Sequence, residues 1–289
     1  MSNSKVPRAI TLSSMILLLG LTACSRDPST SPSAAPGGHE TQEGGPGLSS
    51  NPEELTPAGV RAALGHVTKA SMPDPSQVSE TITGGESMLG ICEWSLSISR
   101  RPGGENVKAL LYGNHPPRDR SVLIVAGHGP LGSLLMMKLH QEAVTTLFIE
   151  ASPGWNLDES VQNVLTGIAY LRGGNDVQSI DLVGLGDGGP IVLLARGLCG
   201  NAVRRTYAQY AGLAVRDVLS AADWQRLPDV LQTADFGRLA IAIAPGELFL
   251  ANTKGLEPQF LKKAYAGFGS LRIEEGLVSS QDIAGWLLR

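Results

Sequence analysis

From residue 121 to the C-terminus, segments with the hydrophobic pattern of a strand alternate with segments with that of a helix. Val122–Ala126 is a continuous apolar run, and Thr145–Ile149 follows as a second short strand, which is typical of strands covered on both faces. Leu131–Ala143 and Leu157–Leu171 place apolar residues at helical spacing, and Ile180–Val183 is a third strand. This alternation predicts an α/β fold with a doubly wound, mostly parallel sheet and helices on both faces.

Further elements complete the prediction of a single domain over residues 52–289, a normal length for an α/β domain. A pair of strands opens it, and strands and helices alternate to its end. The additional elements are strands at Leu89–Ser99 and Val107–Tyr112, a helix at Pro190–Leu198, a strand at Glu247–Ala251, a helix at Pro258–Ala266, a strand at Leu271–Glu274 and a helix at Gln281–Leu288. Such a sheet binds ligands in the crevice at the carboxyl ends of its strands.

Residues 1–23 have the pattern of a secretory signal peptide. Lys5 and Arg8 precede a short apolar run, and small residues lead to Cys24 in Leu-Thr-Ala-Cys. The run is too short to span a bilayer. Leu-Thr-Ala-Cys resembles the bacterial lipobox, which implies that Cys24 is acylated and becomes the mature N-terminus. Several acyl chains on one residue would anchor the protein stably.

An exported protein is therefore expected, lipid-anchored to the cell envelope through Cys24. Residues 24–51 are expected to form a disordered tether, because a segment of Ser, Pro, Gly, Glu and Thr buries too little apolar surface to offset its ordering entropy. Ser25 after the cysteine, in place of Asp, favours the outer membrane, on its periplasmic or surface face.

The net charge and the cysteines indicate which other partners and cofactors are not expected. The formal net charge is −4, and loss of the signal peptide, with two cations and no acid, changes it to about −6. A mildly acidic chain without a basic stripe argues against nucleic acid. Cys92 and Cys199 lie far apart in sequence without metal-ligand spacing, so we predict two buried thiols. Neither a metal nor a cofactor is expected.

A glycine-rich turn follows the third strand. Gly184-Leu185-Gly186-Asp187-Gly188-Gly189 resembles G-x-S-x-G, the strand-to-helix turn that carries the nucleophile of α/β-hydrolases. Gly184 and Gly188 match the flanking glycines. The nucleophile position falls on Gly186, which has no attacking group and relieves the strain that a serine bears at positive φ. A register that makes Asp187 the nucleophile would put a bulky leucine where a small residue is needed.

The other members of the hydrolase triad are also missing from their usual places. In this fold the nucleophile, acid and histidine follow one another along the chain. The strand that usually ends in the acid is followed by Asn252, and the strand before the usual histidine is followed by Glu274 and Glu275, which we expect to be solvated. All histidines precede Gly186; they are His39, His66, His115, His128 and His140.

The chain from about residue 80 to 289 resembles α/β-hydrolase-like proteins of planctomycete type, related to acetyl xylan esterase-like sequences. The resemblance rests on Gly167–Leu171, Leu182–Ala195 and Ile243–Leu248. Members of this group commonly show the glycine-rich turn without a serine. The resemblance therefore implies an α/β-hydrolase fold with a degenerate nucleophile turn, and it implies no particular activity.

The same glycines also satisfy G-x-G-x-x-G between a strand and a helix, as a dinucleotide site requires. In that fold the loop follows the first strand, whereas several strands precede it here. The acid expected about twenty residues further on is replaced by Arg204 and Arg205. Nucleotide binding is therefore the least favoured of three hypotheses, and the other two are given next.

An unorthodox esterase site is a second hypothesis. His128, just past a strand end, and Asp187 could act together, and Trp155 could line the same crevice. Each also has a structural explanation: a histidine bonded to loop backbone, an acid at a helix N-terminus, and a tryptophan packed in its loop. The first hypothesis is a catalytically inactive binding or interaction protein on the hydrolase scaffold, with a small-molecule, glycan or protein ligand.

A geometrical prediction separates these hypotheses. If the hydrolase register is right, Gly186 lies at the tip of the turn with positive φ. The strand ending at Ala126 then neighbours the one ending at Val183, and His128 and Asp187 face one crevice at the carboxyl end of the sheet.

Overall fold

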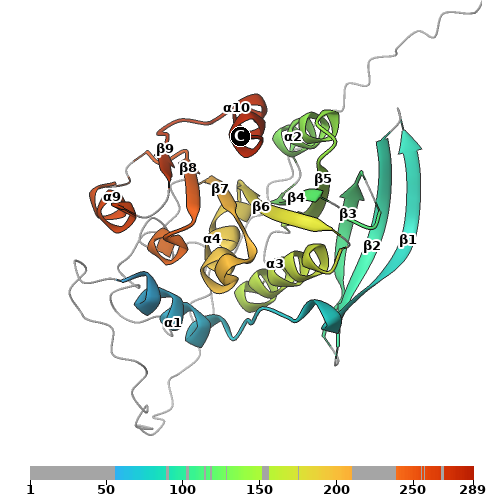
Figure 1. Cartoon of the computed structure of the whole chain (residues 1–289), viewed down its shortest axis with the longest axis horizontal. Helices are drawn as coiled ribbons and strands as arrows, with labels where there is room; N and C mark the ends of the chain where they lie inside the picture. The colour runs from blue at the N-terminus through green and yellow to red at the C-terminus, as the bar shows by residue number, and fades with distance from the viewer. Residues whose placement is uncertain are drawn as a thin grey trace, which may run out of the picture. The chain divides into compact units, whose positions relative to one another are not determined.

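The structure is a computed structural model (Figure 1). It describes residues 56–88, 91–101, 104–113, 115–117, 119–127, 129–151, 156–174, 176–209, 239–254, 256, 258–267 and 270–289. Cys24, His128, Trp155 and the predicted signal peptide and tether lie outside these residues. The elements are α1 (Pro57–Thr68), η2 (Pro75–Gln77), β1 (Val78–Met88), β2 (Ile91–Arg100), β3 (Val107–Tyr112), β4 (Asp119–Ala126), α2 (Pro130–Gln141), β5 (Thr145–Glu150), α3 (Leu157–Arg172), β6 (Val177–Leu185), α4 (Gly188–Leu198), η3 (Gly200–Ala202), β7 (Arg205–Gln209), η4 (Ala240–Ile243), β8 (Glu247–Ala251), α9 (Gln259–Tyr265), β9 (Leu271–Ile273) and α10 (Ser280–Leu287), where η marks a 3₁₀-helix.

The strands form one sheet in the order β1-β2-β3-β5-β4-β6-β7-β8-β9. The pairs from β1 to β5 are antiparallel, and every pair from β5–β4 to β8–β9 is parallel. Helices α2 and α10 pack on one face, and α1, α3 and α4 pack on the other, as Figure 1 shows above and below the sheet. The predicted doubly wound, mostly parallel sheet is confirmed.

Strand β4 shows why its sequence is continuously apolar. Leu123 and Val125 pack against the layer of α1, α3 and α4, whereas Val122, Ile124 and Ala126 pack against the layer of α2 and α10. All five are at most 3% exposed, so both faces of the strand are covered. On α3, the residues predicted to share one face are also fully buried; they are Val161, Val164, Leu165, Ile168 and Leu171.

The sequence pattern misses α1, β1 and β7. Strand β1 lies at the sheet edge and contains mostly polar residues and glycine, so no apolar alternation marks it. Strand β7 has only five residues and begins with Arg205, although its Tyr207 and Ala208 are fully buried. Helix α1 begins after Thr56, whose Oγ1 accepts a capping hydrogen bond from the Gly59 N–H at 3.2 Å.

Two helix boundaries differ from the prediction by two residues, and the others by at most one. Helix α2 ends at Gln141, because Ala143 has a φ of 56°, outside the helical region. Helix α4 begins at Gly188, two residues earlier than expected, because Gly188 and Gly189 form part of its first turn. The end of α2 is therefore set by a residue at positive φ, which the spacing of apolar residues does not predict.

A buried ion cluster ties β6 to its neighbours. Asp181 in β6 is fully buried, and its Oδ2 accepts hydrogen bonds from Arg120 Nη2 at 3.0 Å and Arg204 Nη2 at 2.7 Å. Its Oδ1 accepts a bond from Arg204 Nε at 3.0 Å. Arg204 Nη2 also donates to the Leu287 carbonyl at 3.2 Å. One carboxylate therefore connects β4, β6 and the C-terminal helix.

Both cysteines of the described part are free thiols. Cys199 is buried as predicted, and burial raises the pKa of its thiol. Cys92 is exposed, so the prediction of a second buried thiol is wrong; Cys92 lies near the start of β2, next to the edge strand. Within the described segments, no helix has both the length and the apolar character needed to cross a bilayer.

Candidate ligand site at the strand-to-helix turn

The turn between β6 and α4 has the predicted geometry. Gly186 follows the last residue of β6 and has a φ of 54°, in the left-handed region. Asp187 has helical angles, with φ −62° and ψ −19°, and precedes the first residue of α4. Gly186 therefore lies at the tip of the turn with positive φ, and this prediction is confirmed.

The flanking glycines are required by close packing. A Cβ on Gly188 would collide with the main-chain oxygen of Val125 in β4, and one on Gly189 would collide with the main-chain oxygen of Gln209 in β7. A Cβ on Gly184 would lie 2.6 Å from the Gly188 oxygen. The glycine-rich sequence is thus explained by the close approach of α4 to three central strands.

Gly186 differs from the other glycines of the turn. A Cβ built on it meets no other heavy atom within 4 Å, so only its positive φ disfavours a larger residue. Its N–H donates to Gln209 Oε1 at 2.7 Å. Gln209 is 6% exposed and ends β7, so this bond fastens the turn to the sheet. Sequence reasoning missed Gln209, because β7 has no apolar run and no motif marks its last residue.

A pocket of about 250 Å³ opens beside the turn. Strands β4 and β6 are parallel neighbours, with Ala126 opposite Leu185, and this prediction is also confirmed. The adjacent strand ends bring the β4–α2 loop next to Asp187. The pocket is lined by Ala126, Gly127, Gly129, Pro130, Leu131, Gly132, Leu185, Gly186, Asp187 and Gln209.

Of the two residues of the unorthodox esterase hypothesis, only Asp187 is described. Asp187 is exposed, lines the pocket and makes no side-chain capping bond to α4. The residues on either side of His128, Gly127 and Gly129, line the same pocket. The predicted approach of His128 to Asp187 stays a prediction, because His128 lies outside the described residues.

The two loops that hold the acid and the histidine in a hydrolase are joined here by their main chains. Asn252 N donates to the Gly276 oxygen at 2.9 Å, and Thr253 N donates to the Glu274 oxygen at 3.2 Å. The loops after β8 and β9 therefore meet, but they present Asn252 and Thr253 opposite Glu274 and Glu275. Neither loop offers an imidazole that could take a proton from a nucleophile.

The two glutamates after β9 differ in environment. Glu275 is exposed, as predicted. Glu274 is half-buried, and its Oε1 accepts hydrogen bonds from Arg272 Nε at 3.1 Å and Nη2 at 3.0 Å. The side chain of Glu274 is 45% exposed, so it is solvated as expected, and it also pairs with Arg272 two residues earlier in the chain.

The described residues contain no group of three or more His, Cys, Asp or Glu side chains that could hold a metal ion. The donors around the pocket are main-chain N–H groups and the Gln209 amide, and its one charged lining residue among those described is Asp187. This set can bind a small polar ligand by hydrogen bonds.

No protein-family model and no curated protein sequence matches the chain. Solved structures do resemble it. A proposed acetyl xylan esterase from Bacteroides fragilis has a TM-score of 0.54 at 12% identity over 79% of this chain and 81% of its own. A glucuronoyl esterase from Solibacter usitatus has a TM-score of 0.52 at 13% identity over 79% and 90%. A promiscuous CE15 esterase from a marine bacterial metagenome has a TM-score of 0.53 at 12% identity over 78% and 89%.

Identities this low establish the fold alone. With the sheet order and the strand-to-helix turn, the similarity shows that the chain has an α/β-hydrolase-type fold and that its structural neighbours are esterases of that fold.

Proposed function

We propose that the chain is an exported, lipid-anchored protein that uses an α/β-hydrolase scaffold to bind a ligand without hydrolysing it. The observation that carries this proposal is Gly186, which stands at the tip of the turn at φ 54° where the hydrolase nucleophile would be. Hydrolysis by this fold needs a nucleophile, a base and an orienting acid. Gly186 supplies no nucleophile, and no histidine follows it in the chain.

What remains of the hydrolase site is suited to binding. The first N–H groups of a helix have no partners within the helix and carry a partial positive charge. Helix α4 directs this end toward the pocket beside Gly186. A pocket of about 250 Å³ is small, so it fits a compact polar group, which could belong to a small molecule, a glycan or a protein side chain.

Binding is expected to raise the thermal stability of the purified chain. A screen of acetylated sugars, short esters and nucleotides should include a ligand that stabilises the fold by about 2.7 kcal/mol at a hundredfold excess over its Kd. Gly129→Val supplies the matched control. A Cβ on Gly129 would meet nothing within 4 Å and Gly129 lies on the pocket wall, so the valine side chain should narrow the pocket and reduce the shift. A shift that persists undiminished in this variant would place the ligand elsewhere.

The chain is expected to hydrolyse p-nitrophenyl acetate no faster than heat-denatured protein. Backbone donors can stabilise an oxyanion, but Gly186 supplies no nucleophile that would form one. Gly186→Ser should fold, because the added Cβ has room, and should stay inactive, because no histidine follows Gly186 in the chain to occupy the usual position of the base.

An esterase with a non-standard site is the second candidate. It is favoured by the parallel pairing of β4 with β6, which puts the residues flanking His128 on the same pocket as Asp187. Turnover that survives purification and disappears in Asp187→Asn would contradict the inactive assignment and support this candidate. Nucleotide binding receives less support, because the glycine loop follows β6, after several other strands, and not the first strand of the domain.

Cys24 is proposed as the lipid anchor, which places the protein on the periplasmic or surface side of the cell envelope, with the outer membrane favoured. Cys24→Ala should release the protein from the membrane fraction or leave its precursor uncleaved, as shown by fractionation and mass spectrometry. Mature Cys24→Ala protein that still sediments fully with membranes would show that the lipobox interpretation is wrong.

A further inference from the structure

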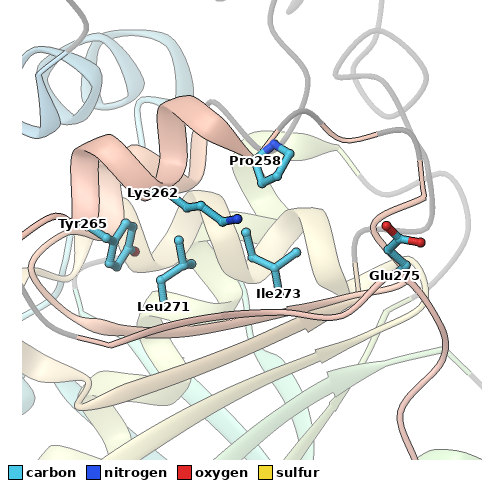
Figure 2. A pocket seen from close by; sticks show the side chains of 6 residues that line it. All are labelled: Pro258, Lys262, Tyr265, Leu271, Ile273 and Glu275. Carbon is cyan, nitrogen blue, oxygen red and sulfur yellow. The ribbon is translucent and has the colours of Figure 1, made fainter.

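A second cavity lies at the β9 edge of the sheet, between α9 and β9. Its volume is about 410 Å³, and its lining residues are Pro258, Lys262, Tyr265, Leu271, Ile273 and Glu275. Figure 2 shows Leu271 and Ile273 rising from β9 toward α9, with Lys262 extending over them and Glu275 beyond the end of the strand. The cavity thus combines an apolar floor with one cation and one anion.

The charges in this cavity are available to a ligand. Lys262 and Glu275 are both exposed, and neither forms an ion pair with any described residue. Tyr265 is 5% exposed, and its hydroxyl lies 3.4 Å from the Ala240 oxygen, so its polar end is directed away from the floor into the protein. Apolar contact from the floor and opposite charges along it would favour an extended ligand that carries both charges.

Strand β9 also offers main-chain groups beside the cavity. It is the last strand of the sheet and, among the described residues, pairs only with β8. The residues on either side of β9 bond to β8: the Ser270 oxygen accepts from Leu248 N, and the Glu274 N–H donates to the Leu250 oxygen, both at 2.9 Å. Along a strand, the N–H and C=O groups of successive residues point alternately to its two sides. The N–H and C=O groups of Leu271 and Ile273 therefore face outward from the sheet.

We propose that this groove binds an extended peptide segment of a partner protein, which adds to the sheet as a strand alongside β9. Strand addition to a free edge takes its affinity from main-chain hydrogen bonds and its specificity from pockets for alternate side chains. An alternate side chain of the added strand would lie about 5 Å from Leu271 or Ile273 and fill the cavity. An acidic residue of the peptide pairs with Lys262, and a basic residue pairs with Glu275. This inference does not depend on the site at the strand-to-helix turn.

Two labelled, acetylated pentapeptides test the proposal by fluorescence polarisation: Asp-Thr-Val-Thr-Lys and Lys-Thr-Val-Thr-Asp. In either, the acid, the valine and the base share one face of a strand. A strand added antiparallel to β9, the more stable pairing, brings its N-terminal residue to Glu275 and its C-terminal residue to Lys262. The purified chain should therefore bind Lys-Thr-Val-Thr-Asp about fivefold more tightly than Asp-Thr-Val-Thr-Lys. The double variant Lys262→Glu with Glu275→Lys should invert this preference, whereas Lys263→Glu, on the same helix but outside the cavity lining, should leave it unchanged.

N-methylation tests the main-chain contacts separately. One analogue of the preferred peptide carries the methyl group on the valine nitrogen and the other on the second threonine nitrogen. Because the two N–H groups face opposite edges of a strand, only one analogue should lose binding, by about tenfold.

Several results would overturn the proposal. These are equal binding of both pentapeptides, a preference that the double variant does not invert, equal tolerance of both N-methyl groups, and a Kd above about 1 mM for both peptides. Self-association of the wild-type chain in sedimentation, lost in Lys262→Glu, would assign the groove to a second copy of this chain and also overturn it.

Discussion

Replacing Asp181 with alanine is expected to lower the free energy of unfolding by about 3–5 kcal/mol, which is the range for removal of one partner from a buried ion pair. Asp181 is fully buried and pairs with two arginines at once, Arg120 and Arg204. Without it, Arg204 loses the partner that holds it beside the Leu287 carbonyl, so the C-terminal helix should loosen as well. Urea denaturation followed by circular dichroism measures the change.

An exposed ion pair supplies the control for this prediction. Glu274 pairs with Arg272, but their side chains are 45% and 38% exposed. Glu274→Ala should therefore change the free energy of unfolding by no more than about 1 kcal/mol. If Asp181→Ala costs as little as Glu274→Ala, the buried cluster does not stabilise the central sheet as we infer.

The sequence predicts the central sheet and the strand-to-helix turn because both depend on local patterns. β4 is buried on both faces and has a continuous apolar run, and β6 is apolar on either side of Asp181. The turn between β6 and α4 needs glycines at fixed spacing. The order of the hydrolase fold then places these two strands side by side, as the structure has them.

Contacts between distant residues could not be predicted in the same way. Asp181 lies within an apolar strand, and its partners Arg120 and Arg204 are 61 and 23 residues away. Gln209 accepts a hydrogen bond from the Gly186 N–H, but it lies in β7, which has no apolar run that would predict a strand. The peptide groove depends on β9 being at the sheet edge, which follows from topology and not from any motif.

Packing also explains why one glycine-rich segment fits two motifs. Gly184, Gly188 and Gly189 allow α4 to approach the main chains of β4, β6 and β7, and any fold with that close approach favours glycine there. Both the hydrolase turn and the dinucleotide loop need such an approach of a helix to a strand. The motif therefore specifies a backbone arrangement, and the hydrolase chemistry depends on the one glycine of the turn with room for a side chain, Gly186.

Alanine substitutions separate these two kinds of glycine. Gly188→Ala should cost about 3 kcal/mol or more of unfolding free energy, because its Cβ would collide with the main-chain oxygen of Val125, and a buried central strand cannot move without repacking both layers. Gly186→Ala should cost only about 1–2 kcal/mol, because its Cβ meets open space and the only penalty is the left-handed φ. Urea denaturation of both variants at equal m-value measures the difference. A loss in Gly186→Ala as large as that in Gly188→Ala would mean that Gly186 is also retained for packing, and its identity would then say nothing about a missing nucleophile.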